Sequence, residues 1–323
     1  MTGLPVEAVV ILCRNSAMFS IRQYKPSDFE QFRELYLLSL GERPVRREKR
    51  LRALNVRFSK PGYTPEKDLF LAYAGGRLAG FLECIPEDTI SRIILNGFVH
   101  PDFRRKGIAG ALLDHAEYLS ALSGRHLFHV CLDEKEASGA SFLAKERFKR
   151  ARIYLDMELD LKRFGEQNFS GPEFELKTLR KGGESLLAEI QNHFFENTWG
   201  FCPNTKDDIR FYLDWTESRI EHVLVHLKND EVAGYLWPHP VEGSSSRRVR
   251  IHMLGIHPRY RGLGMGRSLL SSALKQLGDE GWEEVELTVD SENISARYLY
   301  LSLGFKLRNR LIWFEKRIEM NSD

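Results

Sequence analysis

Hydrophobic residues recur at two different spacings along the chain, and together these spacings predict a mixed α/β protein. A capping signal at Ser27–Glu30 is followed by apolar residues at helical spacing, and a second helix is predicted over Gly107–Ser123. Asp68–Ala74 and Leu78–Cys84 alternate between apolar and polar residues on either side of two glycines, a pattern typical of a β-hairpin. Further apolar segments predict a strand beginning at Ile21, strands over Ser91–Val99, Leu127–Leu132 and Ile153–Leu161, and a helix over Ala137–Lys145.

The chain repeats this pattern once. Val99–Gly110 aligns with Ile256–Arg267 at a spacing of 157 residues, and Phe148 lies the same distance before Phe305. Upstream blocks are 154 residues apart, so about three residues are inserted in the second copy, for which Gly243–Ser246 is the obvious place. Each copy is long enough to fold alone, which predicts a duplicated domain.

The length of 323 residues agrees with two domains of roughly 150 residues each. We expect a leader over residues 1–17, a first domain over 18–161, a linker over 162–173 and a second domain over 174–323. The linker is rich in Gly, Asn, Ser and Pro. Met18 resembles a second start of translation. Residues 1–17 are therefore expected to be either a flexible leader or the result of a wrongly assigned start codon.

Composition excludes several classes of protein. Hydrophobic residues are 42% and charged residues 28%, which is too apolar for intrinsic disorder. The net charge of +2 gives no field that would attract nucleic acid or an anionic membrane, and no apolar run approaches the roughly 20 residues of a membrane span. The four cysteines lie too far apart for a metal-binding set, so we expect no metal, reduced thiols and a cytoplasmic location.

The segment Arg261–Gly266 contains three glycines between a predicted strand and a predicted helix. Glycines let the backbone approach a ligand closely, and the first amides of a helix have no partners of their own, so this segment can bind a diphosphate. A glycine-rich turn without a ligand is the alternative. A dinucleotide-binding fingerprint fits poorly, because the required strand–helix–strand context is absent.

These residues resemble the GNAT superfamily of acyl-CoA-dependent N-acyltransferases, whose phosphate loop has the pattern Arg/Gln-x-x-Gly-x-Gly/Ala. The second copy matches this pattern with Arg261, Gly264 and Gly266. The first copy matches it with Arg104, Gly107 and Ala109. The resemblance covers nearly the whole chain and implies two tandem GNAT-like domains, each a central mixed β-sheet flanked by helices, with acetyl-CoA as cosubstrate. The implied contacts with CoA are Leu254, Gly255, Ile256, Arg261, Gly262, Leu263, Gly264, Met265, Gly266, Arg267 and Asn293 in the second copy, and Phe98, Val99, Arg104, Arg105, Lys106, Gly107, Ile108, Ala109 and Gly110 in the first.

The segment Asn293–Phe305 is similar to a family segment that implies Asn293 beside the pantetheine arm and Tyr300 near the CoA sulfur. A thiol has a pKa of roughly 8.5 and a phenol about 10, so donating a proton from Tyr300 to the leaving thiolate costs only about 2 kcal/mol. Tyr300 is therefore predicted to be the general acid. The alternative is an aromatic residue on the core-facing stripe of a helix.

The general base is less clear from the sequence. Tandem GNAT proteins of the mycothiol synthase type have a glutamate on the strand before the phosphate loop, whereas this chain has Arg250 there. His252 follows two residues later, expected on the same strand face as Arg250 and Leu254, and is a candidate base or simply a half-buried histidine. By resemblance, the backbone amide of Leu254 or Ile256 would stabilise the developing oxyanion.

The first copy has Leu143 where the second has Tyr300, and Glu136 where the second has Asn293. It therefore resembles a domain that holds, or once held, acyl-CoA without catalysis, while the later domain is catalytic. In the second copy, Trp199 and Phe201 belong to an aromatic run that either lines the acceptor pocket or packs as a lid. The basic run Arg43–Arg52 of the first copy is either a solvated helix face or a contact for an anionic partner.

The sequence thus predicts an N-acetyltransferase that acts on a primary amine of a small molecule or peptide, as a monomer or homodimer. A non-catalytic acyl-CoA sensor or scaffold is the alternative.

Overall fold

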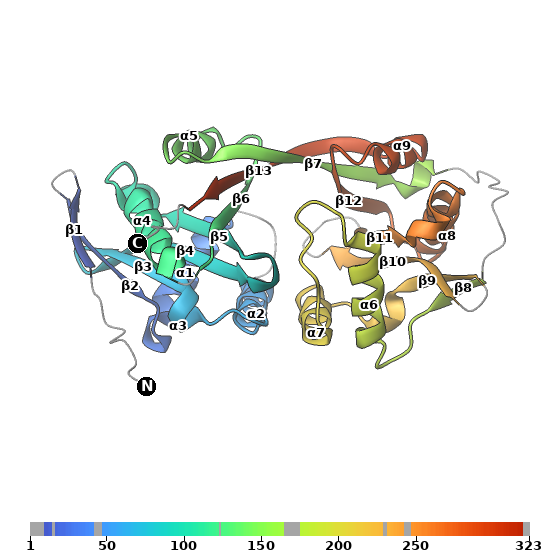
Figure 1. Cartoon of the computed structure of the whole chain (residues 1–323), viewed down its shortest axis with the longest axis horizontal. Helices are drawn as coiled ribbons and strands as arrows, with labels where there is room; N and C mark the ends of the chain where they lie inside the picture. The colour runs from blue at the N-terminus through green and yellow to red at the C-terminus, as the bar shows by residue number, and fades with distance from the viewer. Residues whose placement is uncertain are drawn as a thin grey trace. The chain divides into compact units, whose positions relative to one another are not determined.

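A computed structural model describes residues 10–14, 17–41, 47–122, 124–164, 175–228, 231–241 and 247–318. The chain forms two compact units. Unit 1 comprises Met1–Cys131, Ala137–Ala151 and Phe314–Asp323, and unit 2 comprises Leu132–Glu136 and Arg152–Trp313 (Figure 1). Most of the expected leader and linker lies outside the described residues, and so do residues 43–46 of the basic run, whose remainder begins the helix Arg47–Phe58.

Among the described residues of unit 1, three α-helices follow the first two strands along the chain, and the remaining strands and helices come after them. Its elements are β1 (Val10–Arg14), β2 (Ala17–Gln23), α1 (Phe29–Ser39), α2 (Arg47–Phe58), α3 (Pro65–Asp68), β3 (Leu69–Ala74), β4 (Arg77–Glu87), β5 (Arg92–Val99), α4 (Ile108–Leu122), β6 (Leu127–Asp133) and α5 (Ala137–Lys145). Neighbouring strands from β1 to β5 pair antiparallel, and β5 pairs with β6 in parallel. The aromatic side chains of Phe32 and Tyr36 on α1 pack against Phe81 on β4 in the core.

Unit 2 repeats this plan. Its elements are β7 (Lys149–Asp160), β8 (Glu175–Thr178), α6 (Glu184–Phe195), α7 (Lys206–Trp215), β9 (Leu224–Lys228), β10 (Glu231–Val241), β11 (Arg248–Ile256), α8 (Met265–Asp279), β12 (Glu284–Asp290), α9 (Ile294–Ser302) and β13 (Lys306–Arg317). The strands follow the order β13-β7-β12-β11-β10-β9-β8. One face of this sheet packs on α8, and the other packs on α6 and α7. The mixed α/β architecture predicted from the sequence is confirmed.

Strands β11 and β12 are paired over only part of their length. Their parallel ladder joins four residue pairs, from Arg248 opposite Glu284 to Ile251 opposite Leu287. Beyond Ile251 the strand β11 continues to Ile256 without a partner on the β12 side. The two strands therefore separate, which leaves an opening at their C-terminal ends.

A β-bulge distinguishes β11 from its counterpart in the first repeat. Trp237 lies opposite Met253, but the next residue, Pro238, lies opposite Ile251, so His252 is an extra residue in the strand. The pairing of β4 with β5 runs without such a shift. The spacing between repeats is 156 residues from Arg92 to Arg248 and 157 after the bulge. Two of the three inserted residues therefore lie before Arg248, in the predicted place, and the third is His252.

The last strand of each repeat does not stay with its own repeat. From Tyr154 to Asp160, β7 pairs antiparallel with β12 of the second repeat. In unit 1 the end of β13 approaches β6, because the amide of Ile318 donates to the carbonyl oxygen of His126 at 2.8 Å. Each compact unit thus includes chain from both repeats.

Candidate active site

The loop before α8 presents backbone amides without partners. A short 3-10 helix, Pro258–Tyr260, ends where the amide of Arg261 donates to the carbonyl oxygen of Pro258. Gly262 and Gly264 then adopt φ values of 75° and 79°, a conformation that strains any residue with a side chain. Within the described part of the chain, no hydrogen-bond acceptor faces the amides from Gly262 to Gly266. Since these amides lie at the N-terminus of a 15-residue helix, they are suited to an anion such as a diphosphate.

The side chain of Arg261 braces this loop. Its Nε donates to the carbonyl oxygen of Ile256 at 3.1 Å, and its Nη2 donates to that of Phe194 at 2.5 Å. These bonds connect the end of β11 with the end of α6. The guanidinium of Arg261, predicted to contact the cofactor, is therefore engaged within the protein.

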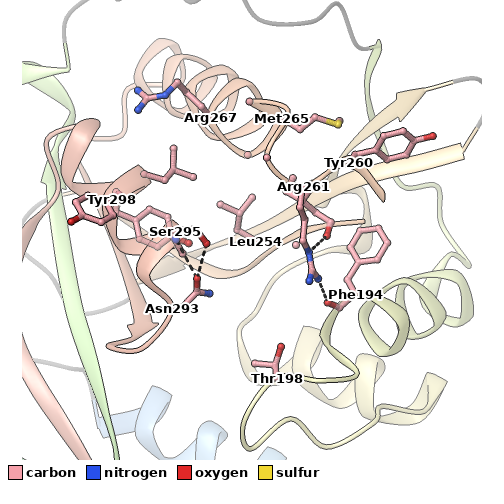
Figure 2. Close-up of a pocket in the computed structure, with 18 of the residues that line it drawn as sticks. Phe194, Thr198, Leu254, Tyr260, Arg261, Met265, Arg267, Asn293, Ser295 and Tyr298 are labelled. Carbon is pink, nitrogen blue, oxygen red and sulfur yellow. Dashed lines mark hydrogen bonds between the residues drawn. The ribbon is translucent and has the colours of Figure 1, made fainter. Parts of the chain in front are cut away.

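A pocket of about 590 Å³ lies between the loop, β11, α6 and α9 (Figure 2). Of the residues predicted to contact the cofactor in the second repeat, all but Leu263 line it, and the Leu263 side chain is 56% exposed. Gly255 is required on its floor, since a Cβ there would lie 2.6 Å from the ring of Tyr235. Phe195, from the aromatic run, also lines the pocket. The motifs did not indicate the other lining residues, namely Phe194, Thr198, Tyr260, Ser295, Ala296, Tyr298, Leu299 and Ser302.

Tyr300 lines this pocket from α9. The residue is 7% exposed, its ring packs 5.6 Å from that of Phe305, and its hydroxyl has no hydrogen-bond partner among the described residues. Burial raises the pKa of Tyr300 above the ordinary value of a tyrosine. The phenol therefore remains protonated at neutral pH and can donate a proton into the pocket.

Asn293 caps the N-terminus of α9 at the same pocket. Its Oδ1 accepts hydrogen bonds from the amide of Ala296 and the hydroxyl of Ser295, both at 3.2 Å (Figure 2). Because the cap occupies the oxygen, the side-chain nitrogen is left to donate to a ligand.

His252 does not share this pocket. The expectation that it lies on the same strand face as Leu254 was wrong, because the bulge turns the strand between the two residues. Its ring packs on those of Trp237 and Tyr212, at 4.9 and 5.6 Å, whereas Leu254 lines the pocket. Burial, with smaller contributions from His239 and Arg250, lowers the pKa of His252 to about 3. A histidine of that pKa is a poor proton acceptor at neutral pH.

Comparison with known proteins identifies both halves of the chain. Residues 185–305 match the model of the acetyltransferase (GNAT) family, and residues 65–150 match that of an acetyltransferase (GNAT) domain. Together these matches cover more than half of the chain. The protein belongs to the GNAT acetyltransferase family. It is a tandem GNAT acetyltransferase, as the resemblance of the two loops predicted.

Curated relatives are similar to this protein over most of its length. A mycothiol acetyltransferase of Paenarthrobacter aurescens is 28% identical over 258 residues, which cover 75% of each chain. One of Geodermatophilus obscurus is 25% identical over 288 residues, covering 82% of this chain and 85% of the relative.

Among solved structures, a GCN5-related N-acetyltransferase from Sphaerobacter thermophilus superposes with a TM-score of 0.68 at 20% identity, over 93% of this chain and 96% of the other. A tandem GNAT protein from the clavulanic acid biosynthesis pathway gives 0.65 at 18% identity, over 94% and 99%. These structural likenesses establish the fold.

The first GNAT loop has the same backbone as the second. Arg105 and Gly107 adopt φ values of 65° and 84°, at the positions that match Gly262 and Gly264. Arg104 donates from its Nε to the carbonyl oxygen of Val99, as Arg261 does to that of Ile256. In the described chain, no acceptor faces the amides from Arg105 to Gly110. Leu143, which replaces Tyr300, is buried.

Trp199 and Phe201, the two residues predicted to bind the acceptor, do not line the pocket between the loop, β11, α6 and α9. Phe201 packs on Phe195 with ring centroids 5.7 Å apart. The ring of Trp199 lies 6.2 Å from those of Tyr154 and Trp313, and the guanidinium of Arg152 lies over it at 5.2 Å. Both side chains are half-buried. Their packing agrees with a lid, although Phe201 supports a pocket wall through Phe195.

The described residues offer neither a cluster of metal ligands nor a membrane-spanning helix. They contain no group of three or more His, Cys, Asp or Glu side chains able to hold a metal ion. None of their helices is long and apolar enough to cross a membrane.

Proposed function

We propose that unit 2 transfers an acetyl group from acetyl-CoA to a primary amine of a small molecule or peptide, with Tyr300 as general acid. The observation that carries this proposal is that one pocket joins the unpartnered amides of Gly262–Gly266 to the buried phenol of Tyr300. The first group suits the diphosphate of CoA, and the second suits its leaving sulfur.

The lining residues fit an extended thioester cosubstrate. The loop amides would hold the diphosphate, and the Asn293 side-chain nitrogen would donate to an amide carbonyl of the pantetheine arm. The arm would lie along Leu254 and Ile256, where β11 has no neighbour on the β12 side. A backbone amide of Leu254 or Ile256 would then face the thioester oxygen as negative charge develops on it.

In the proposed reaction the neutral amine attacks the thioester carbonyl. A C–N bond forms, the C–S bond breaks, and the sulfur takes the proton of Tyr300. The amine loses a proton to solvent, and the tyrosinate recovers one from solvent, so the charges balance. The chain has Arg250, and not a carboxylate, at the position expected for the general base, and the pKa of His252 is too low for that role. We therefore propose that the acceptor binds as the free amine. An α-amine, with a pKa near 8, is already partly neutral at pH 7.

The acceptor is proposed to be a small molecule, because relatives over three quarters of the chain are mycothiol acetyltransferases. For unit 1 we propose CoA binding without catalysis, which the loop amides and the replacement of Tyr300 by Leu143 support. A cytoplasmic location and a monomeric or homodimeric state remain predictions from the sequence.

The test is release of free thiol from acetyl-CoA by the full-length protein with a panel of amines. The panel contains amino sugars, polyamines, amino acids and peptides with free N-termini. We expect amine-dependent release that is lost in Tyr300→Phe. Tight CoA binding without release by any amine would instead favour an acyl-CoA sensor.

A further inference from the structure

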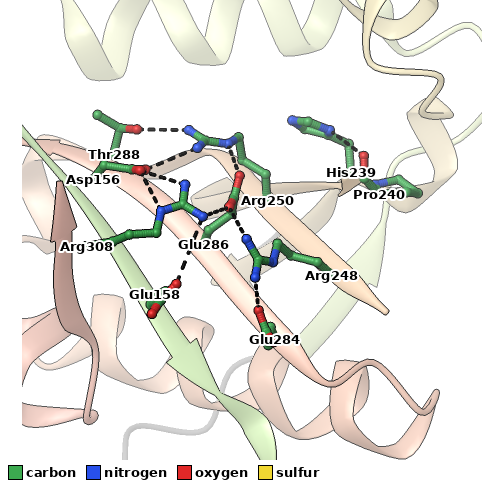
Figure 3. A network of polar contacts seen from close by, with 10 residues as sticks. All are labelled: Asp156, Glu158, His239, Pro240, Arg248, Arg250, Glu284, Glu286, Thr288 and Arg308. Carbon is green, nitrogen blue, oxygen red and sulfur yellow. Dashed lines mark hydrogen bonds and ion pairs between the residues drawn. The ribbon is translucent and has the colours of Figure 1, made fainter. Parts of the chain in front are cut away.

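A ladder of charged side chains crosses four strands of unit 2, on the sheet face opposite α8 (Figure 3). Arg250 lies opposite Glu286 in the β11–β12 register, and its Nε donates to that carboxylate at 2.7 Å. One pair earlier, Arg248 faces Glu284 and also contacts it. These cross-strand pairs hold β11 against β12.

Asp156 completes the ladder from β7. It is 7% exposed and accepts a hydrogen bond from Arg250 Nη2 at 3.1 Å. Arg308 on β13 donates to the same carboxylate from Nε at 2.8 Å and from Nη2 at 2.6 Å, and to Glu286 from Nη1 at 2.6 Å. Two guanidinium groups, those of Arg250 and Arg308, therefore share two buried carboxylates, Asp156 and Glu286. Although burial alone would raise it, Arg250 and Arg308 lower the pKa of Glu286, which keeps this partner ionised.

The ladder lies where the two central strands begin to separate. Their pairing ends at Ile251 and Leu287, one residue beyond Arg250 and Glu286. Arg250 also donates from Nη1 to the hydroxyl of Thr288 at 2.9 Å, and so reaches past the last pair. The bulge at His252 follows directly, and then the pocket floor at Leu254. Arg250 thus lies at the point where the floor strand β11 separates from β12 while it stays paired with β10.

From this geometry we infer that Asp156 is a positioning residue for acetyl transfer. The inference rests on the proposed function. Asp156 holds Arg250, Arg250 fixes the spacing of β11 and β12 at the point of separation, and that spacing aligns Leu254 with Tyr300 across the pocket. The first repeat thereby supplies a side chain that the active site of the second repeat requires.

The counterpart positions in unit 1 support this assignment. Ile94 pairs with His129 where Arg250 pairs with Glu286, so among the described residues this position has no ion pair between β5 and β6. His129 instead contacts Arg92 on β5 at 3.3 Å and Glu315 on β13 at 3.2 Å. Strand β5 of unit 1 also lacks the bulge, and Leu143 replaces the acid. The arginine–carboxylate pair at the end of the parallel ladder, the bulge and the tyrosine thus occur together in unit 2, whereas the described residues of unit 1 have a different residue at each of these positions.

The experiment compares Asp156→Asn with Glu158→Gln in the full-length protein. Glu158 lies two residues further along β7, is half exposed and only approaches Arg308 at 4.0 Å, so it controls for loss of a charge on the same strand. For Asp156→Asn we expect kcat per CoA-binding site to fall about 10- to 100-fold, as for a reacting group displaced by about 1 Å. The Kd of CoA should change little, because the loop amides are untouched. Glu158→Gln should retain both values.

Hydrogen–deuterium exchange gives a readout that does not depend on turnover. Asp156→Asn should accelerate amide exchange in residues 248–256, and Glu158→Gln should not. Unchanged exchange there would overturn the inference even if no amine acceptor were found and the proposed function failed. A lower melting temperature with unchanged kcat per site would also overturn it.

If Asp156→Asn does not fold, the double variant Asp156→Asn/Arg308→Gln removes one charge of each sign and leaves the Arg250–Glu286 pair. We expect its kcat to remain low, because Arg250 still lacks its Asp156 partner. A double variant with the kcat of the unaltered protein would show that charge balance alone matters, and would reject the inference.

Discussion

Replacing Tyr300 by phenylalanine removes one hydroxyl from the pocket and nothing else. The ring keeps its packing 5.6 Å from Phe305, and the hydroxyl forms no hydrogen bond to a described residue that could be lost. We therefore expect the free energy of unfolding to change by less than about 1 kcal/mol. The Kd of CoA should also be unchanged, because the loop amides are more than thirty residues away in sequence and are unaltered.

The catalytic effect should be much larger. A general acid contributes about 10²- to 10⁴-fold, and we expect a loss in kcat of about 10³-fold, or ~4 kcal/mol. Tyr300 is 7% exposed, so water is a poor substitute donor at that position and the thiolate must leave unprotonated.

The pH dependence has a definite sign. Burial raises the pKa of Tyr300, so the protonated form required for catalysis persists above the range in which a free tyrosine ionises. The kcat of the unaltered protein should therefore show no alkaline decline from this group below about pH 10.

The assay is thiol release at saturating acetyl-CoA and amine, with CoA binding measured by calorimetry on the same samples. Leu143→Met is the matched control, since it changes the equivalent position of the first repeat at nearly constant volume. If Leu143→Met abolished turnover and Tyr300→Phe did not, the assignment of the catalytic unit would be reversed.

Three further changes have definite outcomes. Asn293→Asp keeps the oxygen that caps α9 but removes the N–H donors, so the KM for acetyl-CoA should rise about tenfold at unchanged melting temperature; an unchanged KM would remove Asn293 from the pantetheine site. His252 has a folded-state pKa lowered to about 3, so the unfolded chain takes up a proton at this site as the pH falls below about 6.5, and stability should be lost from there toward pH 3. His252→Phe should flatten that loss in denaturant titrations, and a steeper loss would contradict the lowered pKa. Ending the chain after Trp313 removes the buried Phe314 and the Ile318 bond from unit 1, which should destabilise it by about 3 kcal/mol or more; a chain ending after Ile318 is the control, and equal proteolytic resistance of the two would refute this strand assignment.

The repeat and its loops could be predicted from sequence because they are local features. Glycines at positive φ and unpartnered amides at a helix start both depend on residues close together in the chain. The spacing of 157 residues placed the two loops in register, and their backbones do match.

The predictions for His252 and Arg261 differ from the structure because a single inserted residue or a distant element of the chain determines these features. A single inserted residue, His252, makes a bulge that reverses the face of its own side chain relative to Leu254, and alternation alone cannot reveal such an insertion. The brace formed by Arg261 depends on α6 ending close to the loop, which no pattern in the loop encodes.

The pairing of β7 with β12 could not be predicted from the order of elements. Either repeat could have kept its own last strand, and the hydrophobic pattern of β7 would be the same in both cases. The role inferred for Asp156 therefore emerges only from the tertiary structure, because its partners Arg250 and Arg308 lie 94 and 152 residues away.

A crystal structure of the full-length protein with acetyl-CoA bound is the most direct test. We expect the diphosphate within hydrogen-bond distance of the amides of Gly262–Gly266, and the sulfur beside the hydroxyl of Tyr300. A diphosphate bound elsewhere in unit 2, or a thioester directed away from that hydroxyl, would contradict this expectation.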